Sequence, residues 1–319
     1  MNKDKLNKKL SDLEKNYGLV KAKKISAEEK LLTRQYGLDY VLDGGVQLRR
    51  GGHKIELYGA ESSGKTTFAL KMVKAMQDEG KKGVWVVSES FNSEWAEQLG
   101  VNTEELLLAY PDSVEDAGEL ILSLIPEVDF IVLDSVASLI PKAEIDRAMD
   151  EPTRGTQAKA YSYFCRKLYP TIAHEKTTLI FINQVRVDMN KRYGDPETTP
   201  CGKALRHMYD TRINFKPGAP IEQGTKDKKE RIGQEIRLYG KKNKVGVPQR
   251  KIAVDFYFDG RVDNRKSLLF AGIKFCIIGF SGKTYTYKKK KAVGKDNFIK
   301  KLSDEDWKTI EEEVWERLK

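Results

Sequence analysis

A glycine-rich segment at residues 59–67 carries the residue types that bind the phosphates of a nucleotide. It reads Gly-Ala-Glu-Ser-Ser-Gly-Lys-Thr-Thr and fits the pattern of a glycine, four residues and then Gly-Lys-Ser/Thr. In this pattern the glycines allow backbone N–H groups to close around phosphate oxygens. The lysine, Lys65, reaches the β- and γ-phosphates, and the hydroxyl of Thr66 ligates Mg²⁺. We therefore predict a site for a nucleoside triphosphate and Mg²⁺.

The residues on either side of this segment predict the strand and the helix that position it. Residues 54–58 alternate apolar and polar side chains, which is typical of a strand. Residues 68–76 place apolar side chains along one face, which is typical of a helix. A helix that begins at the loop directs its partial positive charge at the phosphates. The order of strand, loop and helix is the context in which the pattern denotes a nucleotide site.

Three polar residues that could complete the site each follow an apolar run. Asp134 ends one such run, and a carboxylate at that position holds Mg²⁺, usually through water. Glu89 could orient and activate the water that attacks the γ-phosphate. Glu94 is the competing candidate for this role, and spacing alone does not separate the two. The amide of Gln184 could hydrogen-bond the γ-phosphate and report its presence to the segment that follows.

That following segment, residues 185–203, has the composition of a surface for single-stranded nucleic acid. It mixes cations for phosphates with an aromatic side chain for stacking, and with glycines for flexibility. A loop this long within a compact domain is usually functional or disordered. A shorter segment, residues 150–155, opens a predicted helix and could form the other wall of a channel. The contributing residues are Arg186, Lys191, Arg192, Tyr193, Gly194, Gly202 and Lys203 in the longer segment, and Lys159 and Arg166 on the helix.

Strands and helices alternate through the centre of the chain, which predicts an α/β fold with a mostly parallel, twisted sheet covered on both faces. Residues 233–241 and 252–258 alternate apolar and polar side chains and are expected to extend the sheet in antiparallel fashion. We expect an N-terminal helix and linker over 1–26, a core over 27–258 and a small α/β domain over 259–319. The predicted strands are 54–58, 84–87, 130–134 and 179–182, and the predicted helices are 68–76, 94–99, 114–124 and 156–173.

The two ends of the chain each predict an amphipathic helix. Residues 3–17 carry leucines and a tyrosine at helical spacing among charged residues. A helix this short is marginal alone, so it must dock on its own core or on a neighbouring subunit. At the other end Ser303 precedes three acidic residues, which is typical of a helix cap. Trp307, Ile310, Val314 and Leu318 then form one apolar side.

Composition narrows the class of protein. The 319 residues carry a formal net charge of +10, which favours a polyanionic partner such as nucleic acid. No apolar run approaches the ~20 residues that span a bilayer, and no apolar stretch follows the N-terminus, so we expect no membrane segment or signal peptide. Cys165, Cys201 and Cys276 lie far apart without metal-type spacing. A reduced, cytoplasmic protein is the simplest expectation.

Four motifs, taken in order, closely resemble the RecA recombinases. They are the glycine-rich segment 59–67, Asp134-Ser135-Val136-Ala137 running to Pro141-Lys142-Ala143-Glu144, Leu179 to Gln184, and Gly194-Asp195-Pro196-Glu197-Thr198-Thr199. The likeness is dense over about residues 40–256 and continues weakly to both ends.

The resemblance implies a RecA-like core, an N-terminal helix that packs on the adjacent protomer, and a small C-terminal domain that guides duplex DNA. It implies helical filaments on single-stranded DNA, homologous pairing and strand exchange, with DNA-stimulated hydrolysis of ATP. The expected partners are single- and double-stranded DNA, further copies of the chain, and single-strand-binding or mediator proteins. The expected cofactors are ATP and Mg²⁺.

The resemblance also implies roles for individual residues. Glu89 matches the catalytic glutamate, which favours it over Glu94, and Trp95 matches an aromatic residue that packs on adenine. Lys242 and Lys244 match a pair that reaches the neighbour's ATP. The implied nucleotide-binding residues are Gly59, Glu61, Ser62, Ser63, Gly64, Lys65, Thr66, Thr67, Trp95 and Asp134. The first DNA loop corresponds to Arg154, Gly155 and Lys159 with Arg166, and the second to Arg186 through Lys203.

The chain departs from the family pattern in several places, including the residues on either side of Glu89 and two positions linked to the DNA loops. His207 stands where an aromatic residue normally links the ATP site to the second DNA loop. Arg154 stands where an apolar residue of the first loop separates base triplets, while Met189 remains an apolar candidate in the second. The alternatives to a recombinase are a DNA-binding filament or mediator that exchanges no strands, and a ring-shaped helicase motor with the same core. A small-molecule kinase fits least, because no second substrate pocket is suggested.

Overall fold

The computed structural model describes most of the chain. The described ranges are 29–145, 155–187, 197–225 and 228–318, together with the isolated positions 5, 7, 9, 11 and 12. The helix predicted at 3–17 therefore lies largely outside the described residues. Arg154, Met189, Lys191, Arg192, Tyr193 and Gly194 also lie outside them.

A nine-stranded sheet forms the centre of the molecule, in the order β13-β12-β11-β10-β3-β7-β6-β4-β5. Six adjacent strands, from β10 to β5, run parallel, and β11, β12 and β13 continue the sheet in antiparallel fashion. The mostly parallel sheet with an antiparallel extension is thus confirmed. The strand bounds are β3 Lys54–Gly59, β4 Gly83–Val87, β5 Leu107–Ala109, β6 Phe130–Asp134, β7 Thr178–Gln184, β10 Thr211–Thr225, β11 Lys228–Asn243, β12 Lys251–Tyr257 and β13 Val262–Asp263.

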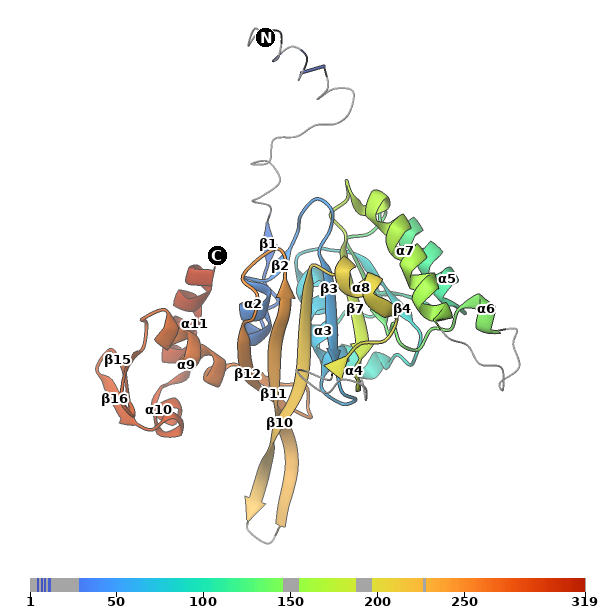
Figure 1. Ribbon diagram of the computed structural model, residues 1–319. Helices are drawn as coiled ribbons and strands as arrows, with labels where there is room; N and C mark the ends of the chain where they lie inside the picture. The colour runs from blue at the N-terminus through green and yellow to red at the C-terminus, as the bar shows by residue number, and fades with distance from the viewer. Residues whose placement is uncertain are drawn as a thin grey trace.

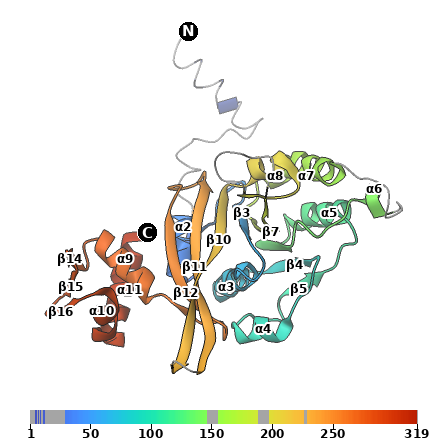
Figure 2. The same ribbon diagram turned by 60° about the horizontal axis from the view of Figure 1, so that its bottom comes forward.

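Helices cover both faces of the sheet, and each face has its own apolar core. Figure 2 shows α3 and α4 on one face, and α5, α7 and α8 on the other. Because side chains alternate along a strand, Trp85 and Ile180 pack with α3, whereas Val86 and Phe181 pack with α5 and α7. The helix bounds are α2 Tyr36–Leu42, α3 Lys65–Asp78, α4 Ser93–Gln98, α5 Val114–Leu124, α6 Lys142–Ile145, α7 Thr156–Ile172 and α8 Gly202–Met208.

Strands β10 and β11 form a long hairpin whose tip projects beyond the sheet (Figure 1). Strand β10 was not predicted, because Pro217, Gly218 and Pro220 are residues that strand interiors disfavour. The pairing accommodates them through a register shift between Pro217 and Pro220. The two short pairs β1–β2 and β8–β9 are separate from the main sheet; their strands are Lys30–Leu31, Val46–Gln47, Arg186–Val187 and Glu197–Thr198.

The C-terminal residues form a small α/β unit beside α2 and β12 (Figures 1 and 2). Its apolar core is continuous with that of the main sheet, since the rings of Tyr36 and Trp315 lie 5.6 Å apart. The predicted cap of the last helix is present: Ser303 N donates to Asp306 Oδ2 at 2.8 Å, and Asp306 N donates to Ser303 Oγ at 3.3 Å. The unit comprises α9 Arg265–Lys274, β14 Gly279–Ser281, β15 Thr284–Tyr287, β16 Lys290–Val293, α10 Lys295–Lys301 and α11 Asp304–Leu318.

Within the described ranges, no helix is long and apolar enough to cross a membrane.

Candidate nucleotide site and nucleic-acid interface

Four strands deliver the predicted nucleotide-site residues to one edge of the sheet. In the register of the parallel strands, Gly59 of β3 faces Gln184 of β7, and Asp134 of β6 lies between Ile182 of β7 and Val87 of β4. Because parallel strands end on the same edge, the residues after each strand meet there. The groups predicted from separate motifs are therefore brought together in space.

The glycine-rich loop needs its glycines for two different reasons. A Cβ on Gly59 would lie 2.3 Å from the carbonyl oxygen of Phe215, so only glycine fits between the strands. Gly64 has φ of 87°, a left-handed conformation that glycine adopts without strain. Helix α3 then begins at Lys65, three residues earlier than we predicted. Lys65, Thr66 and Thr67 therefore lie in the first turn, whose unpaired N–H groups favour an anion.

Lys65, Thr66 and Asp134 form a compact polar group beside the loop. Thr66 Oγ1 donates to Asp134 Oδ2 at 3.0 Å, and Lys65 Nζ donates to the carbonyl of Ala60 at 2.7 Å. Burial, together with the nearby charge of Glu89, raises the pKa of Asp134 to about 6, although the hydrogen bond from Thr66 opposes this rise. Burial also lowers the pKa of Lys65, against the attraction of Asp134.

A Mg²⁺ ion fits the pair of oxygens supplied by Thr66 and Asp134, since this ion prefers oxygen ligands and keeps several waters. Among the described residues no group of three histidines, cysteines or acidic residues could hold a metal ion alone. The remaining ligands would come from water and from phosphate oxygens of the nucleotide, as is usual for Mg²⁺ at phosphate sites.

Glu89 lies at the centre of a hydrogen-bond cluster above the strand ends. Its Oε1 accepts from Ser135 Oγ at 2.6 Å, from Gln184 Nε2 at 3.2 Å and from the hydroxyl of Ser138. Burial raises the pKa of Glu89, but these hydrogen bonds and the charge of Lys65 outweigh it and hold the pKa below its usual value. Glu94, in contrast, is exposed in the first turn of α4, and no described residue contacts its carboxylate within hydrogen-bonding distance.

A cavity of about 480 Å³ adjoins the loop and is suited in size to a nucleotide. Trp95 of α4, Phe256 of β12 and Phe258, which follows β12, also line it. Gln234 of β11 closes one side and donates to the carbonyl of Ser62 at 3.0 Å. A larger cavity, about 580 Å³, lies between α3 and α11, but its lining includes no residue of the glycine-rich loop.

The described residues of the two predicted DNA loops meet at the N-terminal ends of α7 and α8. Gly155 caps α7, and a Cβ on Gly202, at the start of α8, would lie 3.0 Å from the Cβ of Ala158. The first turns of the two helices are thus in contact. The cations predicted for DNA, where described, are all exposed: Lys159, Arg166, Arg186 and Lys203.

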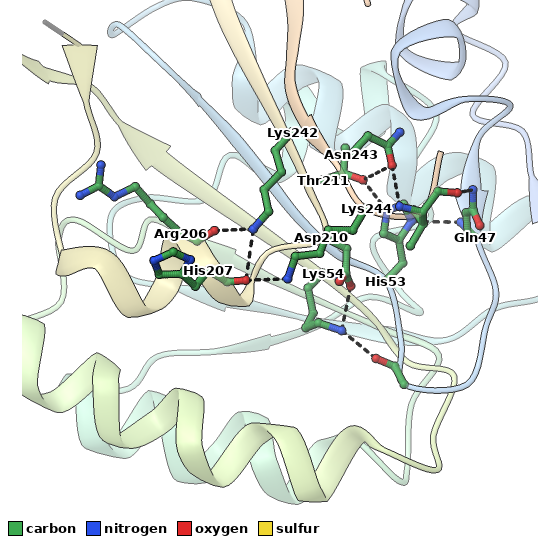
Figure 3. Close-up of polar contacts among 12 residues, drawn as sticks. Gln47, His53, Lys54, Arg206, His207, Asp210, Thr211, Lys242, Asn243 and Lys244 are labelled. Atoms are coloured by element: carbon green, nitrogen blue, oxygen red, sulfur yellow. Dashed lines mark hydrogen bonds and ion pairs between the residues drawn. The ribbon is translucent and has the colours of Figure 1, made fainter. Parts of the chain in front are cut away.

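Lys242 and Lys244 lie near the opposite edge of the sheet, toward the start of β3. Lys242 of β11 lies opposite Arg212 of β10, which in turn lies opposite Glu56 of β3. Glu56 precedes Gly59, where the glycine-rich loop begins. Figure 3 shows both side chains directed at the end of α8: Lys242 Nζ donates to the carbonyl of Arg206 at 2.6 Å, and Lys244 Nζ donates to that of His207 at 2.8 Å.

Burial and the neighbouring charge of Lys244 lower the pKa of Lys242 to about 8. Cations near a helix C-terminus interact favourably with its free carbonyls, so the pair also stabilises α8.

The structure adds a buried network behind these lysines that we did not predict (Figure 3). His53 Nδ1 accepts from Gln47 N at 3.1 Å, so its Nε2 carries the proton and donates to Thr211 Oγ1 at 2.8 Å. Thr211 in turn donates to Asn243 Oδ1 at 3.4 Å. Burial lowers the pKa of His53 to about 3, so it is neutral at pH 7. No spacing rule points to this network, because its members come from distant parts of the chain.

The raised pKa of Asp134 yields a prediction for stability. The carboxyl group of Asp134 ionises less readily in the folded protein than in the unfolded chain. At pH 7.5 its ionisation therefore lowers the free energy of unfolding. Asp134→Asn should therefore raise the free energy of unfolding without nucleotide by about 3 kcal/mol at pH 7.5. The gain should shrink as pH falls through about 6 and vanish below about 3.8, where both states bind the proton. Urea unfolding at several pH values measures it, and a gain that is constant with pH would contradict it.

Comparisons with known proteins identify the family of this chain. The sequence profile of the RecA N-terminal domain matches residues 4–263. Protein RecA of Lactococcus lactis subsp. cremoris (strain MG1363) is 39% identical over 260 residues, which cover 79% of this chain and 67% of the relative. Protein RecA of Enterococcus faecalis is 35% identical over 304 residues, covering 92% and 86%, and that of Streptococcus pneumoniae (strain Hungary19A-6) is 35% identical over 324 residues, covering 93% and 83%. The chain therefore belongs to the RecA family, whose members act in DNA recombination and repair through ATP-dependent filaments.

Proposed function

We propose that this protein is a DNA-stimulated ATPase that forms helical filaments on single-stranded DNA and catalyses homologous pairing and strand exchange in the cytoplasm. One observation carries the proposal: Gln184 donates to Glu89 at 3.2 Å and is also the last residue before the segment 185–203. A single side chain thus joins the candidate hydrolytic carboxylate to the candidate DNA loop.

ATP would bind with its phosphates on the N–H groups of the loop and first turn of α3, held by Lys65. Thr66 and Asp134 would hold Mg²⁺, which neutralises charge on the β- and γ-phosphates. The loop backbone from Gly59 to Gly64 and the hydroxyl-bearing Thr67 would complete the phosphate cradle, and Trp95 would pack on the base.

Glu89 is suited to orient the attacking water. A carboxylate whose pKa lies below its usual value is ionised at pH 7 and accepts a hydrogen bond from water. Gln184 would give up its bond to Glu89 in favour of the γ-phosphate, which frees Glu89 for the water. The same movement would change the start of the segment 185–203, and so make DNA binding depend on ATP.

Single-stranded DNA would bind between the two loops. Lys159 and Lys203, in the first turns of α7 and α8, are exposed and supply charge for phosphates, as do Arg166 further along α7 and Arg186 in β8. Arg154, Gly155, Met189, Lys191, Arg192, Tyr193 and Gly202 are the other residues proposed to contact DNA.

Lys242 and Lys244 would act on the ATP of the adjacent protomer. Their position near the far edge of the sheet is compatible with action on a neighbour rather than on the same chain. A cation inserted from the next protomer stabilises charge on the transferred phosphoryl group. Such a head-to-tail interface does not close on itself and therefore builds an open helical filament.

The test of the proposal is ATP hydrolysis with and without a homopolymeric single-stranded DNA, at low salt with Mg²⁺. We expect DNA to raise the rate by at least tenfold, together with filaments in electron micrographs and strand exchange between homologous DNAs. Equal rates with and without DNA, despite ATP binding, would instead favour a filament or mediator that exchanges no strands. Closed rings in place of filaments would favour a helicase motor.

Glu89 and Glu94 provide a matched pair of variants. Glu89→Gln should retain ATP binding but lower DNA-stimulated hydrolysis by roughly 10²-fold or more, within the usual contribution of general-base catalysis. Glu94→Gln should hydrolyse ATP at close to the unmodified rate, because its carboxylate lies outside the hydrogen-bond cluster. The reverse result would assign the role to Glu94.

Mixing two inactive variants tests action across the interface. Lys242→Ala/Lys244→Ala keeps a complete loop but lacks the lysines, and Lys65→Ala keeps the lysines but lacks the loop lysine. Neither should hydrolyse ATP alone with DNA, whereas a mixture should recover part of the activity at mixed interfaces. A mixture as inactive as its components would contradict the cross-subunit role.

A further inference from the structure

The end of β7 is joined to the returning end of the segment 185–203 by an unbroken chain of polar contacts inside the protein. Gln184 N donates to the side-chain oxygen of Asn183 at 2.9 Å. Asn183 Nδ2 donates to Glu56 Oε1 at 3.0 Å, and both side chains are completely buried. The contact therefore leads from the site edge of β7 into the neighbouring strand β3.

Glu56 passes the connection to Arg212 of β10. Its Oε2 forms an ion pair with Arg212 Nε, and the side-chain exposures are 0% for Glu56 and 15% for Arg212. The guanidinium also lies 4.7 Å from the ring centroid of Tyr58. Arg212 Nη2 then donates to Thr199 Oγ1 at 3.1 Å, at the far end of the 185–203 segment.

The same face of β10 holds that far end at two more points. Arg212, Asn214 and Lys216 project to one side because side chains alternate along a strand. Asn214 Nδ2 and Lys216 Nζ donate to the carboxylate of Glu197, each at 2.9 Å. Glu197 lies in β9, which pairs with β8 directly after Gln184. The segment thus starts at the end of β7, and near its other end it is held by side chains from the first half of β10.

A buried ion pair transmits displacement because neither charge can lose its partner without a large cost in free energy. Arg212 is a rigid fork fixed by Glu56 on one side, by Thr199 on another and by Tyr58 beneath it. A shift of Asn183 with Gln184 must therefore move Glu56 and Arg212, or break a contact in a place that water does not reach.

We propose that Glu56 and Arg212 are positioning residues that couple the γ-phosphate contact of Gln184 to the DNA loop through Thr199. The proposal rests on the function proposed above, in which Gln184 meets the γ-phosphate and the segment 185–203 binds DNA. This route lies inside the sheet and does not pass through the side chain of His207. It gives this chain a connection that does not need an aromatic residue at position 207.

The experiment removes one hydroxyl at the loop end of the relay. Thr199→Val keeps the shape of a buried side chain but cannot accept the hydrogen bond from Arg212, and Thr198→Val is the control at the adjacent position of β9, whose hydroxyl is not part of the relay. We would measure hydrolysis without DNA, hydrolysis with a homopolymeric single strand, and affinity for that strand with and without a non-hydrolysable ATP analogue.

We expect Thr199→Val to retain hydrolysis without DNA within about twofold, but to lose at least fivefold in the stimulation by DNA. The increase in DNA affinity caused by the analogue should also fall, and because coupling between two binding sites is reciprocal, DNA should raise the affinity for the analogue by the same reduced factor. Thr198→Val should lose clearly less stimulation than Thr199→Val, because its hydroxyl does not accept from Arg212, and Thr199→Ser, which restores the hydroxyl, should recover the stimulation.

Two results with Thr199→Val would overturn the relay. One is full stimulation in Thr199→Val, and the other is an equal loss of hydrolysis with and without DNA, which would mean a purely structural role. Arg212→Lys is a second test, because lysine keeps the ion pair with Glu56 but lacks the guanidinium that also reaches Thr199. Undiminished stimulation of hydrolysis by DNA in this variant would also overturn the relay. A lack of stimulation in the unmodified protein would instead refute the proposed function.

Discussion

The site depends on one constraint: parallel strands end at the same edge of a sheet. Gly59, Gln184, Asp134 and the residues after Val87 are separated by tens of residues in the chain, yet the register of four strands places them side by side. The apolar cores on both faces fix this register, since a slip by one residue would exchange the two faces. The chemistry of the site is therefore a consequence of how the sheet is packed.

Two carboxylates near one lysine differ because their surroundings differ. Asp134 is buried with one hydroxyl donor, and burial raises its pKa to about 6. Glu89 is more open and accepts from three side chains, which lower its pKa despite partial burial. The first is therefore easily neutralised unless a cation is near, whereas the second is ionised at pH 7. This difference matches a metal ligand beside a group that orients water.

Local patterns predicted most of the core, and long-range contacts could not be predicted. The segment 59–67 predicted the loop because pattern and flanks agree, and apolar runs predicted β4, β6 and β7 to within about two residues. Helix α9 was missed because it buries residues on several sides and shows no single apolar stripe. The ion pair of Glu56 with Arg212 joins residues 156 apart in the chain, so only the sheet register reveals it.

The lysine pair at the end of β11 implies that the two ends of any polymer differ in chemistry. Suppose that Lys242 and Lys244 act on the nucleotide site of an adjacent protomer. The protomer at one end of the polymer then presents lysines that face no phosphate. The protomer at the other end holds a nucleotide site that no neighbouring lysine reaches. The lysines that face no phosphate would keep their hydrogen bonds to the carbonyls of Arg206 and His207. Turnover per protomer would then rise with polymer length, and fragmentation alone would slow hydrolysis without altering any residue.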